Sequence, residues 1–188
     1  MKKIIFTFIL LVSLNGCVLS STSNYYVLSM ASHPSVVYKD KNKAIGVEKI
    51  TIPGYLYKRE IAVAKNANQI TLLANAVWGE DLDSGLTQRL ISFLQRKFNQ
   101  PNVHAYPWGT GNQPSVKVNV NITRFIAQGD KVYLDTNWEV VHVNTNKRKA
   151  KLFSTTVSTS SDAASIVDAM NRAFGQLEED VAKGVKSL

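Results

Sequence analysis

The stretch Val116-Lys117-Val118-Asn119-Val120-Asn121-Ile122-Thr123 carries the clearest pattern of this sequence. Branched apolar residues alternate with polar ones, and this period of two predicts a β-strand with one buried face and one face in water. Gln128-Gly129-Asp130-Lys131 predicts a hairpin connection, and Val132 to Val143 a long return strand. Ala150 to Ser158 then completes a predicted antiparallel meander of three strands.

Two amphipathic helices are predicted, one before the meander and one after it. The first runs from Asp81 to Phe98, and the second starts at about Asp162 with Ser161 as its N-cap. Apolar residues recur at three- and four-residue spacing in both. They are Leu82, Leu86, Leu90, Phe93, Leu94 and Phe98 in the first helix and Ile166, Met170, Ala173, Phe174, Leu177 and Val181 in the second.

Shorter strands precede the meander. They are predicted at Tyr25 to Met30, at Ala44 to Ile52, and in a hairpin of Glu60 to Lys65 with Gln69 to Leu73, and a further one lies at Val103 to Tyr106. This order of strands and helices predicts an α/β fold, a sandwich of a mixed, largely antiparallel β-sheet with two main helices.

The start of the chain has the pattern of a secretory signal. Two lysines precede an apolar stretch from Ile4 to Leu14, which is too short to span a bilayer. Leu14-Asn15-Gly16-Cys17 resembles the bacterial lipobox, in which the cysteine is acylated and becomes the first residue of the mature protein. The alternative is an ordinary signal followed by an incidental or buried thiol. Val18, where Asp would retain a lipoprotein in the inner membrane, resembles the outer-membrane pattern.

These features predict the organisation of the chain. Residues 1–16 are the signal peptide, residues 17–24 a lipidated tether, and residues 25–188 a single domain. Residues 18–24 reach roughly 23 Å when fully extended, so the domain is expected close to the periplasmic face of the outer membrane. The net charge of +8 favours anionic head groups or an acidic protein as partner, because an exported chain rarely meets nucleic acid.

Side chains that could carry catalysis or bind a metal are sparse. His33, His104 and His142 are far apart in the sequence, and we expect no metal and no cofactor. Glu80, Asp81 and Asp83 form the densest acidic group. Their position at a helix start favours a role as partners of the helix dipole over acid–base catalysis, so no enzyme is expected.

Basic and aromatic residues leave two interpretations open. Lys147, Arg148 and Lys149 lie in a predicted hairpin turn, where they either face solvent or contact lipid head groups. Trp78 and Trp108 adjoin turn residues, where a large ring either fills a loop or anchors an interface.

An ordered set of segments covers nearly all of the mature chain. It comprises Tyr25-Tyr26-Val27-Leu28, Ile50-Thr51-Ile52-Pro53-Gly54-Tyr55-Leu56, Glu60-Ile61-Ala62-Val63, Trp78-Gly79-Glu80-Asp81-Leu82, Tyr106-Pro107-Trp108 and Trp138. With this set the chain resembles the auxiliary lipoproteins of ABC-type lipid transport systems, a family that includes the third component of the Pqi membrane-integrity system. It departs from the family at Tyr57-Lys58-Arg59, where an Asp-Arg-Pro-like stretch is common, and at Asp81, where Pro is frequent.

The resemblance implies a non-catalytic outer-membrane lipoprotein that docks on a periplasm-spanning protein of the mammalian-cell-entry (MCE) type. Such a protein supports lipid transport between membranes and envelope integrity, and self-association into a homo-oligomer is expected. Contacts with the partner or with further copies are expected at Pro53, Tyr55, Leu56, Tyr57, Trp78, Glu80 and Trp108.

Two other functions stay open. One is a structural or assembly lipoprotein that binds an outer-membrane protein or the cell wall. The other is an envelope hydrolase, in which Glu80, Asp81 and Asp83 would have to converge with His142 in one pocket.

Overall fold

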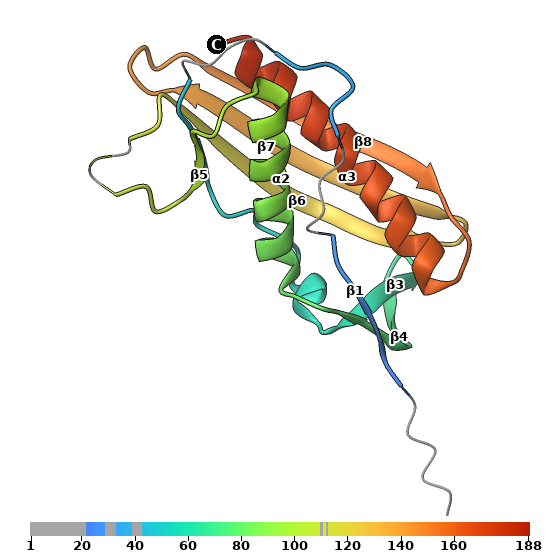
Figure 1. Ribbon diagram of the computed structural model, residues 1–188. Coiled ribbons are helices and arrows are strands. Elements are labelled where there is room, and N and C mark those ends of the chain that lie inside the picture. The colour runs from blue at the N-terminus through green and yellow to red at the C-terminus, as the bar shows by residue number, and fades with distance from the viewer. Residues whose placement is uncertain (1–21, 29–32, 39–42, 110, 112) are drawn as a thin grey trace, which may run out of the picture.

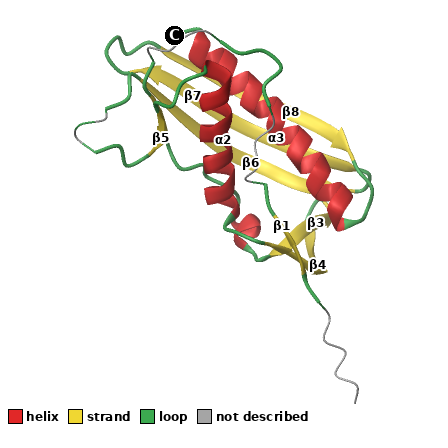
Figure 2. Cartoon of the chain, viewed as in Figure 1, coloured by secondary structure: helices red, strands yellow, loops and turns green. Residues whose placement is uncertain are grey.

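The computed structural model describes residues 22–28, 33–38, 43–109, 111 and 113–188. They form a mixed eight-stranded sheet with two α-helices that lie together over one of its faces (Figure 1; Figure 2). The elements in chain order are β1 (Asn24–Tyr26), β2 (Ile45–Val47), the 3-10 helix η1 (Gly54–Tyr57), β3 (Glu60–Asn66), β4 (Gln69–Trp78), α2 (Leu82–Phe98), β5 (Val103–Ala105), β6 (Val116–Gln128), β7 (Lys131–His142), β8 (Arg148–Ser158) and α3 (Ala163–Lys186). The predicted fold class is confirmed.

The meander β6–β7–β8 is antiparallel throughout, as predicted, and β8, which pairs with β7, is an edge strand of the sheet. The other edge of β6 is shared by two short parallel partners. β2 pairs with its start, where Ile45 lies opposite Val116, and β3 pairs with its end, where Val63 lies opposite Ala127. β5 extends the sheet beyond β2, and the hairpin β3–β4 carries β1 at its far edge. The mixed character of the sheet therefore comes from its short strands.

The helices bury the apolar side chains of the sheet. α3 lies against β7 and β8, while α2 lies beside β5 and contacts α3. α2 begins at Leu82 with Asp81 as its N-cap residue, one position later than predicted. α3 begins after Asp162, whose carboxylate accepts a hydrogen bond from the Ser165 amide at 2.9 Å. The prediction of Ser161 as N-cap was therefore wrong by one residue.

The early strands differ most from their predicted bounds. β1 covers only Asn24–Tyr26, because the chain then leaves the sheet and buries Leu28; residues 29 and 30 lie outside the described residues. β2 ends at Val47, and only an isolated bridge from Thr51 to Asn121 follows it. β4 continues to Trp78, five residues beyond the predicted end at Leu73. Asn75, at a φ of 59°, lies within this extension, so Trp78 ends a strand and does not stand in a loop.

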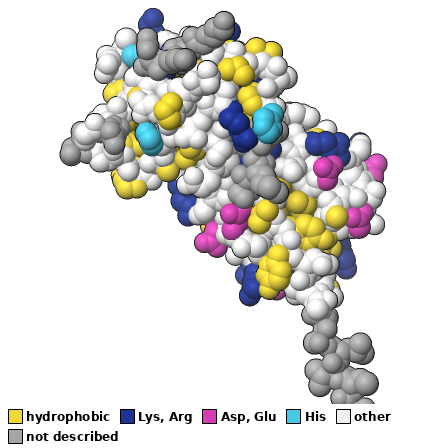
Figure 3. Space-filling model, viewed as in Figure 1, with side chains coloured by type: hydrophobic (Ala, Val, Ile, Leu, Met, Phe, Trp, Pro, Cys, Tyr) yellow, Lys and Arg dark blue, Asp and Glu magenta, His cyan; other side chains and the backbone are white. Residues whose placement is uncertain are grey.

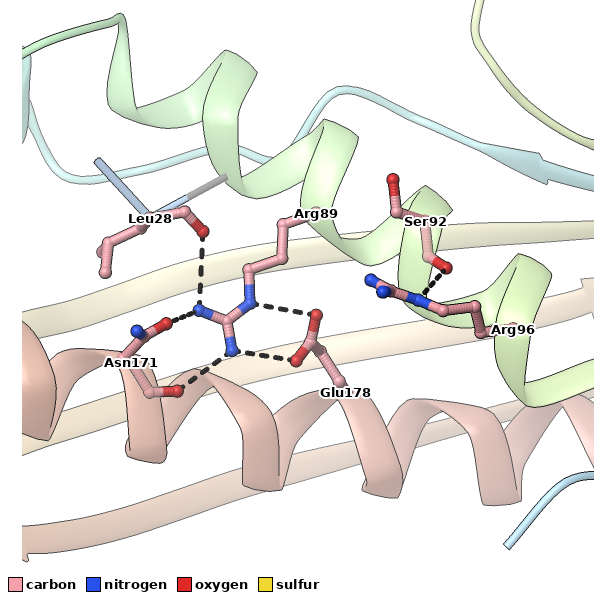
Figure 4. Close-up of polar contacts among 6 residues, drawn as sticks. All are labelled: Leu28, Arg89, Ser92, Arg96, Asn171 and Glu178. Carbon is pink, nitrogen blue, oxygen red and sulfur yellow. Dashed lines mark hydrogen bonds and ion pairs between the residues drawn. The ribbon is translucent and has the colours of Figure 1, made fainter. Parts of the chain in front are cut away.

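A buried polar cluster joins the two helices to the N-terminal segment (Figure 4). The Arg89 guanidinium of α2 binds both carboxylate oxygens of Glu178 on α3, at 3.0 and 3.1 Å. It also donates to the Leu28 carbonyl at 3.4 Å and to Asn171, and it lies 5.1 Å from the centre of the Phe174 ring. These bonds fix the chain just after β1 against both helices. Among the described residues, neither helix is long and apolar enough to cross a membrane.

Candidate functional site

The two segments predicted as contact surfaces meet at one hollow. It is lined by Leu56–Arg59, by Trp78–Leu82 and by Tyr25, and its volume is about 340 Å³. Backbone bonds hold these segments together, because the Trp78 amide donates to the Arg59 carbonyl and the Gly79 amide to the Tyr26 carbonyl, both at 2.8 Å. The hollow therefore lies where β4 ends and the chain turns into α2. Figure 3 shows hydrophobic, acidic and basic side chains gathered at this end of the molecule, around β1.

The walls of the hollow belong to the core. Leu56 is only 2% exposed, and Trp78 only 6%. The indole N–H of Trp78 is buried and has no hydrogen-bond acceptor among the described residues. Tyr55, which precedes Leu56, is half-buried, and its hydroxyl accepts a hydrogen bond from the Phe125 amide at 3.0 Å. Burial raises the pKa of the Tyr55 hydroxyl, so this side chain is a neutral structural group.

The mouth of the hollow is exposed and carries charges of both signs. Tyr57 is 61% exposed, next to the exposed Lys58 and Arg59. The Arg59 guanidinium lies over the Tyr25 ring, 5.9 Å from its centre, and donates to the Tyr25 hydroxyl at 3.4 Å. Of the predicted contact residues here, Tyr57 and Glu80 are thus the ones that a partner reaches without rearrangement of the chain.

Acidic residues line the opposite segment, at the start of α2. Glu80 and Asp81 are exposed and line the hollow. The Glu80 carboxylate extends over the first turn of α2, where a Cβ on Gly85 would come within 2.6 Å of its Oε1. Asp83 is buried and binds Lys49 at 2.7 Å, and this hydrogen bond raises the pKa of the Lys49 ammonium. The three acids predicted as helix-dipole partners therefore differ in environment, since only two of them line the hollow.

Trp108 does not line this hollow. It lies in the loop after β5, against Gly46, where a Cβ would come within 2.5 Å of the indole ring. Tyr106 packs edge-on against it with ring centres 5.0 Å apart, and the Lys117 ammonium lies 5.1 Å from the indole ring. The part of Trp108 that stays exposed belongs to a separate surface. Contacts of Trp108 with a partner stay a prediction.

The predicted basic cluster lies at the opposite end of the sheet from β1 (Figure 1). Lys147 and Arg148 follow the β7–β8 turn, and Arg148 binds Glu139 at 3.4 Å. The Lys149 ammonium reaches the Ser187 hydroxyl at 3.3 Å. Head-group contact by Lys147, Arg148 and Lys149 stays a prediction.

His142 and the acidic group stand on different elements. His142 ends β7 and accepts a hydrogen bond from the Thr145 amide at 3.3 Å, whereas Glu80, Asp81 and Asp83 surround the start of α2. In the described part of the chain, no three side chains of His, Cys, Asp or Glu lie close enough together to hold a metal ion.

Sequence reasoning missed the place of Tyr25 in the hollow. The aromatic pair at the start of the domain was visible, but the parallel pairing of β1 with β4, which sets Tyr25 opposite Val77, involves residues more than fifty positions apart. No local pattern in the sequence predicts this pairing.

Comparison with known proteins identifies the family. The model of the ABC-type transport auxiliary lipoprotein component matches residues 26–182. The chain belongs to this family. The match confirms the resemblance and includes every segment of the hollow except Tyr25. Cys17 lies outside both the match and the described residues.

Solved structures share the fold of this lipoprotein at low sequence identity. A Xanthomonas campestris protein of the DUF330 family is 13% identical, with a TM-score of 0.71 over 87% of this chain and 94% of that one. A protein described only as uncharacterised is 20% identical, with a TM-score of 0.68 over 88% of this chain and 99% of that one. A comparison with curated proteins found no match.

Proposed function

We propose that this lipoprotein is a non-catalytic component of the outer membrane that docks on a periplasm-spanning MCE-type protein. In this role it supports lipid transport between membranes and envelope integrity. The family supports a part in ABC-type transport. The MCE-type partner follows from the resemblance of the sequence to the Pqi system.

The observation that carries the docking proposal is the meeting of Leu56–Arg59 and Trp78–Leu82 at one hollow. Both segments contain residues that the sequence predicts as contacts, and η1 and the end of β4 bring them together. Tyr57 and Arg59 are exposed at the hollow, and interfaces are enriched in both residue types. The partner would therefore contact the mouth of the hollow, while Leu56 and Trp78 shape its walls.

The site of the lipid anchor agrees with this arrangement. With residues 1–16 removed and Cys17 acylated, residues 18–24 would connect the membrane to β1, at the hollow. The domain of residues 25–188 would then hold its docking site near the outer membrane. Further copies in a homo-oligomer would present several such sites to one elongated partner.

Site-specific cross-linking in intact cells tests this function. A photo-reactive phenylalanine analogue replaces Tyr57, and the matched control replaces Leu152, which is 83% exposed on β8 and far from the hollow. Recovery of an MCE-type protein from position 57 but not from position 152 would support the proposal. Recovery of an outer-membrane protein or wall fragments alone at position 57 would support the structural or assembly function instead.

A further inference from the structure

Opposite charges surround the hollow without pairing. Lys58 and Arg59 come from the segment before β3, and Glu80 and Asp81 from the segment before α2. Opposite charges close together on a protein surface readily form ion pairs, yet among the described residues none of these four side chains takes part in one. A molecule that carries both a negative and a positive group would satisfy both segments at once.

The wall of the hollow contains a tryptophan whose indole N–H differs in environment from those of the other two. The indole N–H of Trp108 donates to the His104 carbonyl at 3.3 Å, and that of Trp138 to Asp180 at 3.0 Å. The indole N–H of Trp78 is buried without an acceptor in the described part of the chain. This N–H is enclosed, so it is not a contact for a bound molecule, but Trp78 lines the hollow and its indole signal reports on what binds there.

The hollow also lies within reach of a membrane. Tyr25 lines it and lies eight positions after Cys17, a distance of roughly 26 Å at full extension. With Cys17 acylated, the head groups of the anchoring membrane are the most abundant small polar molecules near the site. A volume of about 340 Å³ is within the range of small-ligand sites.

We propose that this hollow binds the phosphoethanolamine head group of a phospholipid. The phosphate oxygens accept hydrogen bonds from Lys58 and Arg59, and the ammonium group contacts Glu80 and Asp81. A lipid that bears only a negative charge is disfavoured, because the two carboxylates repel it. This inference rests on the proposed function and deepens it, since it assigns the lipoprotein a direct contact with lipid.

Nuclear magnetic resonance tests the proposed head-group site. The sample is the purified mature lipoprotein in maltoside micelles and phosphate-free buffer. The three tryptophans give three indole N–H signals, and Trp78→Phe identifies the signal of Trp78. Glycerophosphoethanolamine, glycerophosphoglycerol, ethanolamine and inorganic phosphate are each titrated. We expect glycerophosphoethanolamine to shift the Trp78 signal and to leave the signals of Trp108 and Trp138 in place. Its dissociation constant should be at least about tenfold lower than those of the other three.

Substitutions at the mouth separate the two halves of the site. Arg59→Gln and Glu80→Gln should each weaken binding about tenfold, since each removes one charge-assisted contact. Lys183→Gln, an exposed residue in the last turn of α3 and outside the hollow, should leave binding unchanged. Binding of inorganic phosphate as tight as that of glycerophosphoethanolamine would show a simple anion site and overturn the proposal. So would an unmoved Trp78 signal, or equal binding by the Glu80→Gln variant.

Failure of the head-group proposal can be distinguished from failure of the docking proposal. The titration contains no partner protein, whereas cross-linking at position 57 detects the partner without measuring lipid binding. If cross-linking captures an MCE-type protein but no head group shifts the Trp78 signal, only the proposed head-group site is overturned.

Discussion

The Glu178 carboxylate lies 3.0 Å from the Arg89 guanidinium, and both side chains are almost completely buried. Burial raises the pKa of Glu178 to about 7, against the opposing effect of Arg89, which favours the charged carboxylate. The ordinary pKa of 4.5 applies when the chain is unfolded. Between these two values the folded state holds more protons than the unfolded state, so the free energy of unfolding falls as the pH rises through this window.

We therefore expect the protein to lose stability between about pH 4.5 and 7, by up to roughly 3 kcal/mol from Glu178 alone. Urea denaturation at several pH values measures this slope. Glu178→Gln, which mimics the protonated acid, should remove most of this slope, so the two proteins should differ least in stability near pH 4.5 and the variant should be the more stable one above pH 7. Asp168→Asn, on the exposed side of α3, is the matched control and should keep the slope. An unchanged slope in the Glu178 variant would contradict this account.

The meander and both helices could be predicted from the sequence because their burial patterns are local. β6 alternates between buried and less buried residues over Val116–Ile122, and one stripe of α3 packs on the sheet. The hollow could be predicted only as two unconnected segments. Its assembly depends on long-range parallel pairing and on the extension of β4 past Asn75, where a left-handed residue lies in a strand. Arg89 was also unpredictable as a core residue, because its charge is balanced by Glu178, 89 residues away.

The start of α3 gives a second prediction. Asp162→Ala should lower the melting temperature, since the amide of Ser165 then loses its acceptor. Ser161→Ala is the neighbouring control and should change stability by much less. The pKa of Asp162 is lowered by its bonds to Ser165, so the difference between the variants should shrink in acid as Asp162 becomes protonated. Equal effects of the two variants in thermal denaturation would contradict the assignment of Asp162 as the N-cap of α3.

Two helical glycines should respond in opposite ways to alanine. A Cβ on Gly184 would come within 2.6 Å of the Trp138 ring, which is buried and fixed by its bond to Asp180. Gly184→Ala should therefore cost roughly 1–3 kcal/mol from overpacking, against a gain of about 1 kcal/mol in helix propensity. At Gly85 the close atoms belong to the exposed Glu80 side chain, which can move away, so Gly85→Ala should be neutral or stabilising. Chemical denaturation of both variants tests the contrast, and destabilisation by Gly85→Ala would show that Glu80 is held in place.

Substitutions at two neighbouring positions of η1 should have different effects, one on folding and the other on partner binding. Leu56 is part of the core, so Leu56→Asp buries an unpaired charge and should unfold the domain or lower its stability by several kcal/mol. Tyr57 is exposed, so Tyr57→Asp should leave the far-ultraviolet circular dichroism and the melting temperature nearly unchanged. If the mouth of the hollow is the docking site, this second variant should still weaken capture of the partner, because it removes an aromatic contact and adds charge beside Glu80 and Asp81. Full partner capture by a folded Tyr57→Asp variant would place the docking surface elsewhere, and the exposed side of Trp108 would be the next surface to test.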